Sequence, residues 1–320
     1  MTKLFQHLGL AAAACAVALC GCATRPEAPR MAARAPARPA PPTLRDQAPA
    51  PSGLAVQASA FEAFMRHARR IDPAFGGPSD VAQALQTAAT HEPHELEAGM
   101  IAYAALAALQ EPRFVAAARA EGPDLARRIA ADPQAVLALP GAEAAEARAS
   151  GALYAEGSAL SGEGEKIKHA AYTVQHQAWA KAKVPDAAGR LSRVKRLSGE
   201  AYQPAREDAA ELQMSLAGAA RRSGAPSPVV ARGLALAALS VLGETRQAQS
   251  LMSEPRTTSC LHMAKLNLYQ CLASAGPHYE DIFCLGQHAM IDPGQCVVEA
   301  TEARAEAPRR VAVTRASFTR

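Results

Sequence analysis

Apolar side chains recur along this chain with the spacing of helix faces. Leu54, Phe61, Met65 and Ala68 follow the i, i+3, i+4, i+7 pattern, and similar spacing continues to about residue 292. Proline is tolerated in the first turn of a helix but not in its interior, so prolines within such a pattern mark helix starts. The pattern predicts an all-α domain over 54–298, with helices opening at Glu92-Pro93, Glu111-Pro112, Gly122-Pro123, Asp132-Pro133 and Ser227-Pro228.

Several local features refine this pattern. Ser79 is a predicted N-cap, and Ser59 with Glu62 offers a capping box, so the first helix begins before or at Ser59. The segments 98–109 and 229–242 are apolar nearly all round and are therefore predicted to be central helices. Glycines at 157, 162 and 164 predict a break, followed by a fresh helix over 165–183. Three residues of that helix are expected to pack in the core: Tyr172, Val174 and Trp179.

Composition supports helices and excludes some functions. About a quarter of the 320 residues are alanine and only 4% are aromatic, which favours packed helices over a sandwich or barrel. Helix pairs alternate weakly but without a self-similar period, so an irregular multi-helix bundle is expected rather than a solenoid. The net charge of +4 comes without a basic stripe, and no nucleic-acid partner is predicted.

Residues 1–22 have the pattern of an export signal. Lys3 precedes an apolar segment, 8–19, that is too short to span a bilayer. The ending Leu19-Cys20-Gly21-Cys22 resembles the lipobox of bacterial lipoproteins. This resemblance implies lipidation of Cys22, with acyl chains such as palmitate, and a periplasm-facing protein at the outer rather than the inner membrane. Cleavage after Ala18, which would release a soluble periplasmic protein, is the alternative.

The two ends of the mature chain are expected to be flexible. Residues 23–53 hold eight prolines and five arginines against two acids, a composition typical of a disordered tether. The segment 299–320 has five arginines against three glutamates and is predicted to be a flexible basic tail.

Four cysteines follow Cys22, and all lie between residues 260 and 296. An even number in an exported chain indicates disulfides. We expect Thr258 or Ser259 to cap one helix that ends near Ala275. A second helix is expected over 278–291, ended by Asp292-Pro293-Gly294. Across this antiparallel hairpin, 258–296, the level pairs are Cys260 with Cys296 and Cys271 with Cys284, so these disulfides are predicted.

The cysteine layout resembles the twin-cysteine hairpins of coiled-coil-helix proteins, which pair outer with outer and inner with inner cysteines. A zinc site is the alternative, because Cys284 and His288 are four residues apart and Cys260 lies close to His262. An oxidising compartment favours the disulfides. No metal or cofactor is predicted.

Other candidate chemistry is sparse. His91 and His94 flank Pro93, which places them at a helix start where they need not converge on a metal. The basic run over 190–196 is predicted to be a solvated helix face, with an anion-binding patch as the alternative; it comprises Arg190, Arg193, Lys195 and Arg196. Candidate acid–base groups at the hairpin turn are His278, Glu280 and Asp281.

The function hypothesis follows from the predicted anchor. The chain resembles Ala-rich bacterial envelope lipoproteins, a resemblance that supplies no activity. The leading hypothesis is a non-enzymatic scaffold or binding module, held at a membrane by its N-terminal lipid and engaging an envelope protein or cell-wall partner. An envelope or cell-wall-modifying enzyme is one alternative, and a metal or redox protein that uses the cysteine hairpin is the other.

Overall fold

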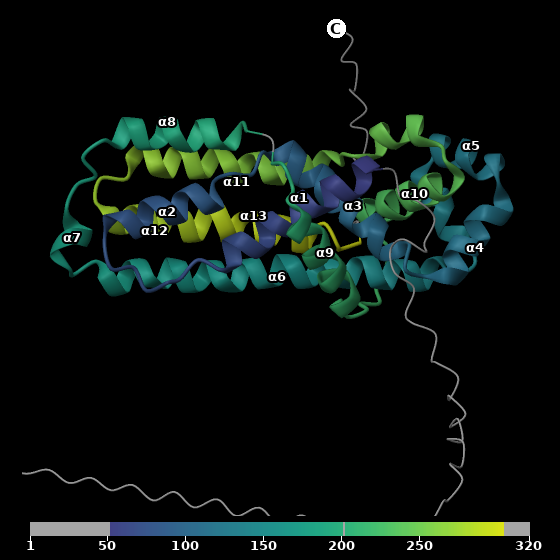
Figure 1. Ribbon diagram of the computed structural model, residues 1–320, viewed down its shortest axis with the longest axis horizontal. Helices are drawn as coiled ribbons and strands as arrows, with labels where there is room; N and C mark the ends of the chain where they lie inside the picture. The colour runs from purple at the N-terminus through teal and green to yellow at the C-terminus, as the bar shows by residue number, and fades with distance from the viewer. Residues whose placement is uncertain (1–51, 201, 304–320) are drawn as a thin grey trace, which may run out of the picture. The chain divides into compact units, whose positions relative to one another are not determined.

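The computed structural model describes residues 52–200 and 202–303 (Figure 1). The predicted signal 1–22 with Cys22, the tether up to residue 51 and the tail from residue 304 lie outside the described residues. The described chain forms helices and no strands, which confirms the predicted all-α class.

Thirteen α-helices and three short helices of other types make up the described residues. The α-helices are α1 (Ser52–Arg69), α2 (Pro78–Ala88), α3 (Pro93–Ala108), α4 (Pro112–Glu121), α5 (Pro123–Ala131), α6 (Ala142–Val174), α7 (Ala178–Lys181), α8 (Ala187–Ser198), α9 (Arg206–Gly218), α10 (Pro228–Leu242), α11 (Pro255–Ser274), α12 (His278–Cys284) and α13 (Asp292–Glu299). The others are the 3₁₀ helices η1 (Pro133–Ala138) and η2 (Thr245–Leu251) and the π-helix η3 (Leu285–Ile291).

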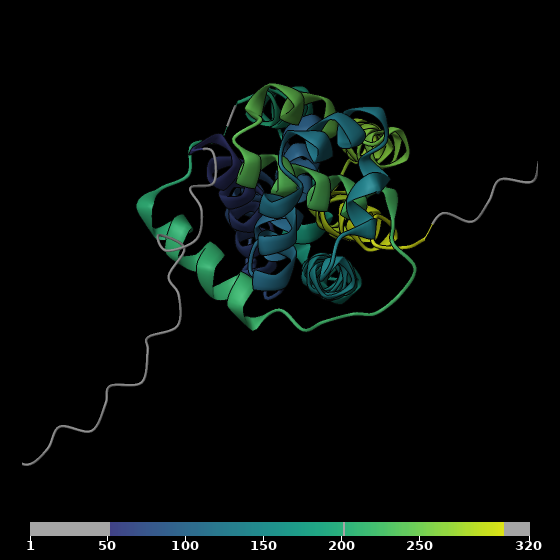
Figure 2. The ribbon, with the colours of Figure 1, turned by 90° about the vertical axis from the view of Figure 1, so that its right-hand side faces the viewer.

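The two nearly all-apolar helices are central, as predicted. α3 packs against α1, α6, α10 and α11, and all its residues from Gly99 to Ala108 are buried. α10 crosses it closely, because Gly233 has no Cβ and the Ala104 side chain fills that space. The core is therefore built largely from alanine and leucine. Figure 2 views the molecule along its long axis, so that α6 is seen end-on.

The predicted proline starts are confirmed, with one difference of helix type. α3, α4, α5 and α10 each begin at the proline of their pair, whereas the helix that opens at Pro133 is 3₁₀. The prediction of Ser79 as an N-cap was wrong, because Pro78 already opens α2 and Gly77 is its cap. α1 begins before Ser59, at Ser52.

The predicted break at Gly157, Gly162 and Gly164 was wrong. α6 runs without interruption over 142–174, along one side of the molecule in Figure 1. Two of its glycines lie where the C-terminal hairpin crosses: a Cβ on Gly157 would lie 2.7 Å from the Gly294 carbonyl oxygen, and one on Gly164 would lie 2.9 Å from the Ile291 nitrogen, whereas a Cβ on Gly162 would meet nothing within 4 Å. Backbones meet at Gly157 and Gly164, so these two glycines allow close packing rather than ending the helix.

The hairpin is longer than predicted at both ends. α11 begins at Pro255 and is capped by Glu254, whose side chain accepts from the Arg256 and Thr257 nitrogens, so the predicted cap at Thr258 or Ser259 was wrong. The second arm does not end at Asp292. In η3 the Asp292 N–H donates a hydrogen bond to the Gln287 carbonyl, five residues earlier. This wider turn leaves room for the Pro293 ring, which in a regular α-helix would clash with the carbonyl of the preceding turn. The arm then continues as α13, past Cys296.

The folded part also extends beyond residue 298. Ala300 and Thr301 are buried, and the Ala300 carbonyl accepts a hydrogen bond of 2.6 Å from Ser227 Oγ. This contact ties the end of α13 to the start of α10. The first residues of the predicted basic tail 299–320 therefore belong to the bundle.

Candidate functional site at the C-terminal hairpin

The hairpin holds the predicted cysteine pairs. The structure joins Cys260 of α11 to Cys296 of α13, and Cys271 of α11 to Cys284 of α12, with Cα–Cα distances of 5.7 and 5.6 Å. These spacings are ordinary for disulfides. All four cysteines after Cys22 are thus used, in the nested pairing that the hairpin geometry predicts.

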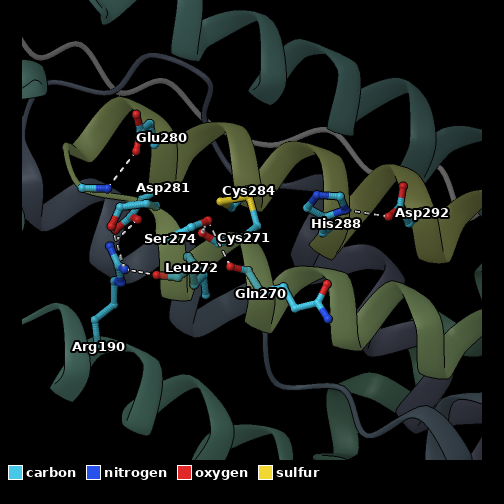
Figure 3. The surroundings of a disulfide bond; sticks show 12 residues. Arg190, Gln270, Cys271, Leu272, Ser274, Glu280, Asp281, Cys284, His288 and Asp292 are labelled. Carbon is cyan, nitrogen blue, oxygen red and sulfur yellow. Dashed lines mark hydrogen bonds and ion pairs between the residues drawn. A yellow bond between two sulfur atoms is a disulfide. The ribbon is translucent and has the colours of Figure 1, made fainter.

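The turn of the hairpin is held by a buried ion pair (Figure 3). Arg190 of α8 donates to the Asp281 carboxylate and to the Leu272 carbonyl, and its contact with the Ala275 carbonyl is 3.3 Å. It therefore satisfies carbonyls that the end of α11 leaves without helical partners. Burial raises the pKa of Asp281 to about 6, although Arg190 lowers it.

This ion pair corrects the interpretation of the basic run. Arg190 is 5% exposed and structural rather than solvated. Its neighbours on α8 do lie on an exposed face: Arg193 pairs with Asp186 at 3.2 Å, and Lys195 lies 5.4 Å from the centre of the Tyr269 ring. The four basic side chains therefore do not converge on one anion.

The predicted acid–base groups at the turn are engaged by the fold. Glu280 accepts a 2.7 Å hydrogen bond from the Gly276 nitrogen, and Asp281 is held by Arg190. His278 is buried beside Trp179, and burial lowers its pKa, with a further contribution from the Arg190 charge. These groups hold the turn in place and do not line a common reaction centre.

An aromatic groove lies beside the inner disulfide. Its cavity of about 380 Å³ is lined by Tyr172 of α6, Tyr279 and Phe283 of α12, and the Cys271–Cys284 pair. Tyr172 is 50% exposed, and its ring meets that of Phe283 edge-on at 6.3 Å. The prediction that Tyr172 packs in the core was therefore wrong, whereas Val174 is buried and Trp179 packs against the core.

The serine and carboxylate groups of this groove are already paired within the protein. Ser274 Oγ donates to the Gln270 and Cys271 carbonyls, and both Glu280 oxygens accept, from the Gly276 nitrogen and from the Tyr279 hydroxyl. What the groove offers a ligand is therefore mainly aromatic and apolar surface. We call this surface, lined by Tyr172, Tyr279, Phe283 and the inner disulfide, the hairpin groove.

The zinc alternative has no support at the hairpin. Cys284 is in a disulfide, and His288 Nδ1 lies 2.7 Å from an Asp292 oxygen. Burial would raise the pKa of Asp292, but hydrogen bonds from His288 and Gln287 outweigh it and lower the pKa. Within residues 52–200 and 202–303, three or more potential metal ligands do not cluster anywhere.

His91 and His94 do not face one another. His91 is buried against the Phe64 ring, with Nδ1 3.3 Å from the Ala88 carbonyl oxygen, and burial lowers its pKa well below the usual range. His94 is exposed and meets His262 of α11 instead, with 3.1 Å between their Nε2 atoms. Sequence reasoning missed this pair, because the two residues are 168 positions apart.

Sequence reasoning also missed a charged cleft between α1, α3, α6 and α9, of about 450 Å³. The Glu156 carboxylate lies in this cleft, where it accepts a 2.9 Å hydrogen bond from Ser215 Oγ and forms an ion pair of 3.0 Å with Arg69. The Ser215 hydroxyl is also 2.6 Å from the Tyr103 hydroxyl. Burial raises the pKa of Glu62 at the edge of this cleft, although Arg66, whose Nε contacts both Glu62 carboxylate oxygens, lowers it. Four helices contribute, so no local motif signals the cleft.

Comparison with known proteins adds no relative. None of the described helices is both long and apolar enough to cross a membrane. The chain matches no protein-family model, no curated protein and no solved structure.

Proposed function

We propose that this chain is a non-enzymatic binding module of the cell envelope, exported and held at a membrane by a lipid on Cys22. The signal-like segment with Cys22 motivates the anchor. Outer-membrane placement is the expectation because Ala23 follows Cys22 at the position where lipoproteins kept at the inner membrane usually have Asp. Disulfides persist in oxidising compartments, so the pairing of Cys260 with Cys296 and Cys271 with Cys284 supports export.

The hairpin groove is the observation that carries the binding role. Exposed aromatic side chains are enriched at protein interfaces and dominate their energetics. The groove is held rigid by a disulfide and by the Arg190–Asp281 pair, which limits the entropy that binding would cost. Its mainly aromatic and apolar lining favours an apolar side chain of a partner protein as the occupant.

Site-specific photo-crosslinking in intact cells tests this role. A photoreactive residue at Tyr172 should capture a defined envelope protein, and capture should be lost when Phe283 is changed to Ser. A photoreactive residue at Met263, an apolar position on α11 that is equally exposed at 50%, is the control and should not capture that protein. Equal capture from both positions would contradict a role for the groove.

Mass spectrometry of the mature N-terminus tests the anchor separately. A diacylglyceryl-modified Cys22 is the expected result. An unmodified N-terminus at Leu19 would mean cleavage after Ala18 and a protein without this anchor.

A cell-wall-modifying enzyme is the second candidate, and the charged cleft favours it. The cleft holds two carboxylates in different environments, as a general acid–base pair requires. Burial raises the pKa of Glu62, whereas Glu156 is paired with Arg69. Purified protein would then release soluble fragments from isolated cell walls, and Glu156→Gln would abolish the release. Fragment release that is unchanged in Glu156→Gln, or no release by the wild type, would exclude this cleft.

A further inference from the structure

We propose that His94 and His262 form a two-histidine binding site for a late first-row divalent cation: Zn²⁺, Cu²⁺ or Ni²⁺. His94 lies in the first turn of α3, and His262 lies in the second turn of α11. Both imidazoles are exposed, so a cation can enter from solvent. The proposal does not rest on the binding role of the hairpin groove.

The geometry suits shared coordination. The two Nε2 atoms are 3.1 Å apart, and zinc–imidazole bonds of about 2.0–2.1 Å would then enclose an N–metal–N angle of about 100°. That angle lies between the tetrahedral and octahedral values. The rings are steeply inclined, at 73°, with centroids 4.6 Å apart, so they do not stack on one another.

Without a cation, one imidazole donates its Nε2 hydrogen to the other. With a cation, both rings would carry their hydrogen on Nδ1 and present Nε2 lone pairs to the metal. Imidazole is a preferred ligand of all three cations, and affinity is expected to be highest for Cu²⁺. Water molecules would complete the coordination, because the described residues supply no third potential ligand in a cluster.

The surrounding contacts preorganise the pair. One turn along α3 from His94, the fully buried Glu97 accepts from Thr258 Oγ at 2.8 Å and from the Glu254 nitrogen at 2.6 Å. Thr258 lies one turn before His262 on α11. On the other side of His262, Lys265 Nζ donates a 2.9 Å hydrogen bond to the carbonyl of Ala89, the C-cap residue of α2.

The Glu97 contacts join α3 to α11 on one side of the histidines, and the Lys265 contact joins α11 to the end of α2 on the other. A cation that joins α3 to α11 would therefore meet ligands already in position and would pay little to order them.

Metal titration of the mature, disulfide-intact protein, with any free thiol alkylated and without an added histidine tag, tests the proposal. ZnCl₂, CuCl₂ and NiCl₂ are titrated separately by calorimetry, and Tm is measured with and without each salt. The wild type should bind one equivalent of each cation and gain thermal stability. His94→Ala and His262→Ala should each weaken binding about 100-fold, because the chelating pair is lost, and should remove the gain in Tm.

His176→Ala is the matched control, because His176 is an exposed histidine outside α3 and α11, and it should bind like the wild type. His262→Gln serves as a second variant of similar size if His262→Ala does not fold. No binding by the wild type at millimolar metal, or binding that survives either single variant, would overturn the proposal.

Discussion

At the scale of single residues, Lys265 is a basic side chain buried in the protein interior, where desolvation disfavours its charged form. Its side chain is 4% exposed, and burial lowers its pKa from 10.5 to about 7. Between these two values the unfolded chain holds a proton that the folded chain has released. The free energy of unfolding therefore rises with pH across this window, and the penalty for burying the charge is fully present below it.

Replacing Lys265 with Met should remove that penalty. Ser198 Oγ continues to donate 2.7 Å to the Ala89 carbonyl, so that oxygen keeps a partner. We expect Lys265→Met to raise the free energy of unfolding, with a gain about 1–3 kcal/mol larger at pH 6 than at pH 9. Urea denaturation at the two pH values measures this difference. The control is Lys195→Met, at an exposed position, and its effect on the free energy of unfolding should be the same at both pH values. A gain for Lys265→Met that is independent of pH would contradict a lowered pKa for Lys265.

Arg190 and Arg193 lie one turn apart on α8 and should differ sharply in their contribution to stability. Arg190→Gln leaves the buried Asp281 without its cationic partner and should cost about 3–5 kcal/mol. Arg193→Gln breaks only an exposed pair with Asp186 and should cost less than about 1 kcal/mol. Urea denaturation at pH 8 compares the two variants. A cost as small for Arg190→Gln as for Arg193→Gln would mean that both arginines are solvated.

At the scale of elements, two glycines of α6 only two residues apart should respond in opposite directions to alanine. A Cβ on Gly162 meets nothing within 4 Å, so Gly162→Ala should stabilise the helix by about 0.5–1 kcal/mol. A Cβ on Gly164 would collide with Ile291 and Met290, so Gly164→Ala should cost about 1–3 kcal/mol. Thermal unfolding followed by circular dichroism compares them. Stabilisation by both would show that the hairpin does not pack on α6 as described.

These glycines also show which parts of the fold a sequence can specify. Proline acts on its own turn through a fixed φ and a missing N–H, so the starts of α3, α4 and α10 follow from local sequence. A glycine either breaks a helix or admits a neighbour, and the choice depends on what lies across from it. The hairpin that faces Gly164 is more than 120 residues away, so the continuity of α6 was not predictable.

The same distinction applies to the candidate sites. The disulfide pairing was predictable because both partners of each bond lie on neighbouring arms around one turn. The hairpin groove needs Tyr172 from α6, and the His94–His262 pair joins α3 to α11. Such sites depend on the tertiary arrangement and leave no local pattern.

The two disulfides should contribute unequally to the stability of the hairpin. The outer bond closes a separation of 36 residues, and the inner one closes 13 residues within it. The Cys260→Ala/Cys296→Ala double variant should lose about 2–4 kcal/mol, and Cys271→Ala/Cys284→Ala should lose less. Urea denaturation compares the variants. Peptide mapping without reduction checks the pairing, and a Cys260–Cys284 or Cys271–Cys296 bond would contradict it.

At the scale of the whole molecule, α6 joins the hairpin to the rest of the core. It packs against α12, η3 and α13, and also against α3, α4 and α10 (Figure 1). Because these helices share one hydrophobic core, loss of either set exposes apolar surface of the other. The described helices should therefore unfold together rather than as separate units.

The chain's one tryptophan, Trp179, allows this cooperativity to be measured. Its ring lies 6.5 Å from that of His278 at the hairpin turn, so its fluorescence reports the hairpin, whereas far-ultraviolet circular dichroism reports all helices. With both disulfides intact the two signals should share one midpoint in urea. After reduction the hairpin arms lose their covalent links, and the Trp179 transition should move to lower urea than the dichroism. Separate midpoints in the intact protein would instead show that the hairpin is an independent unit, held to α6 more weakly than its glycine contacts imply.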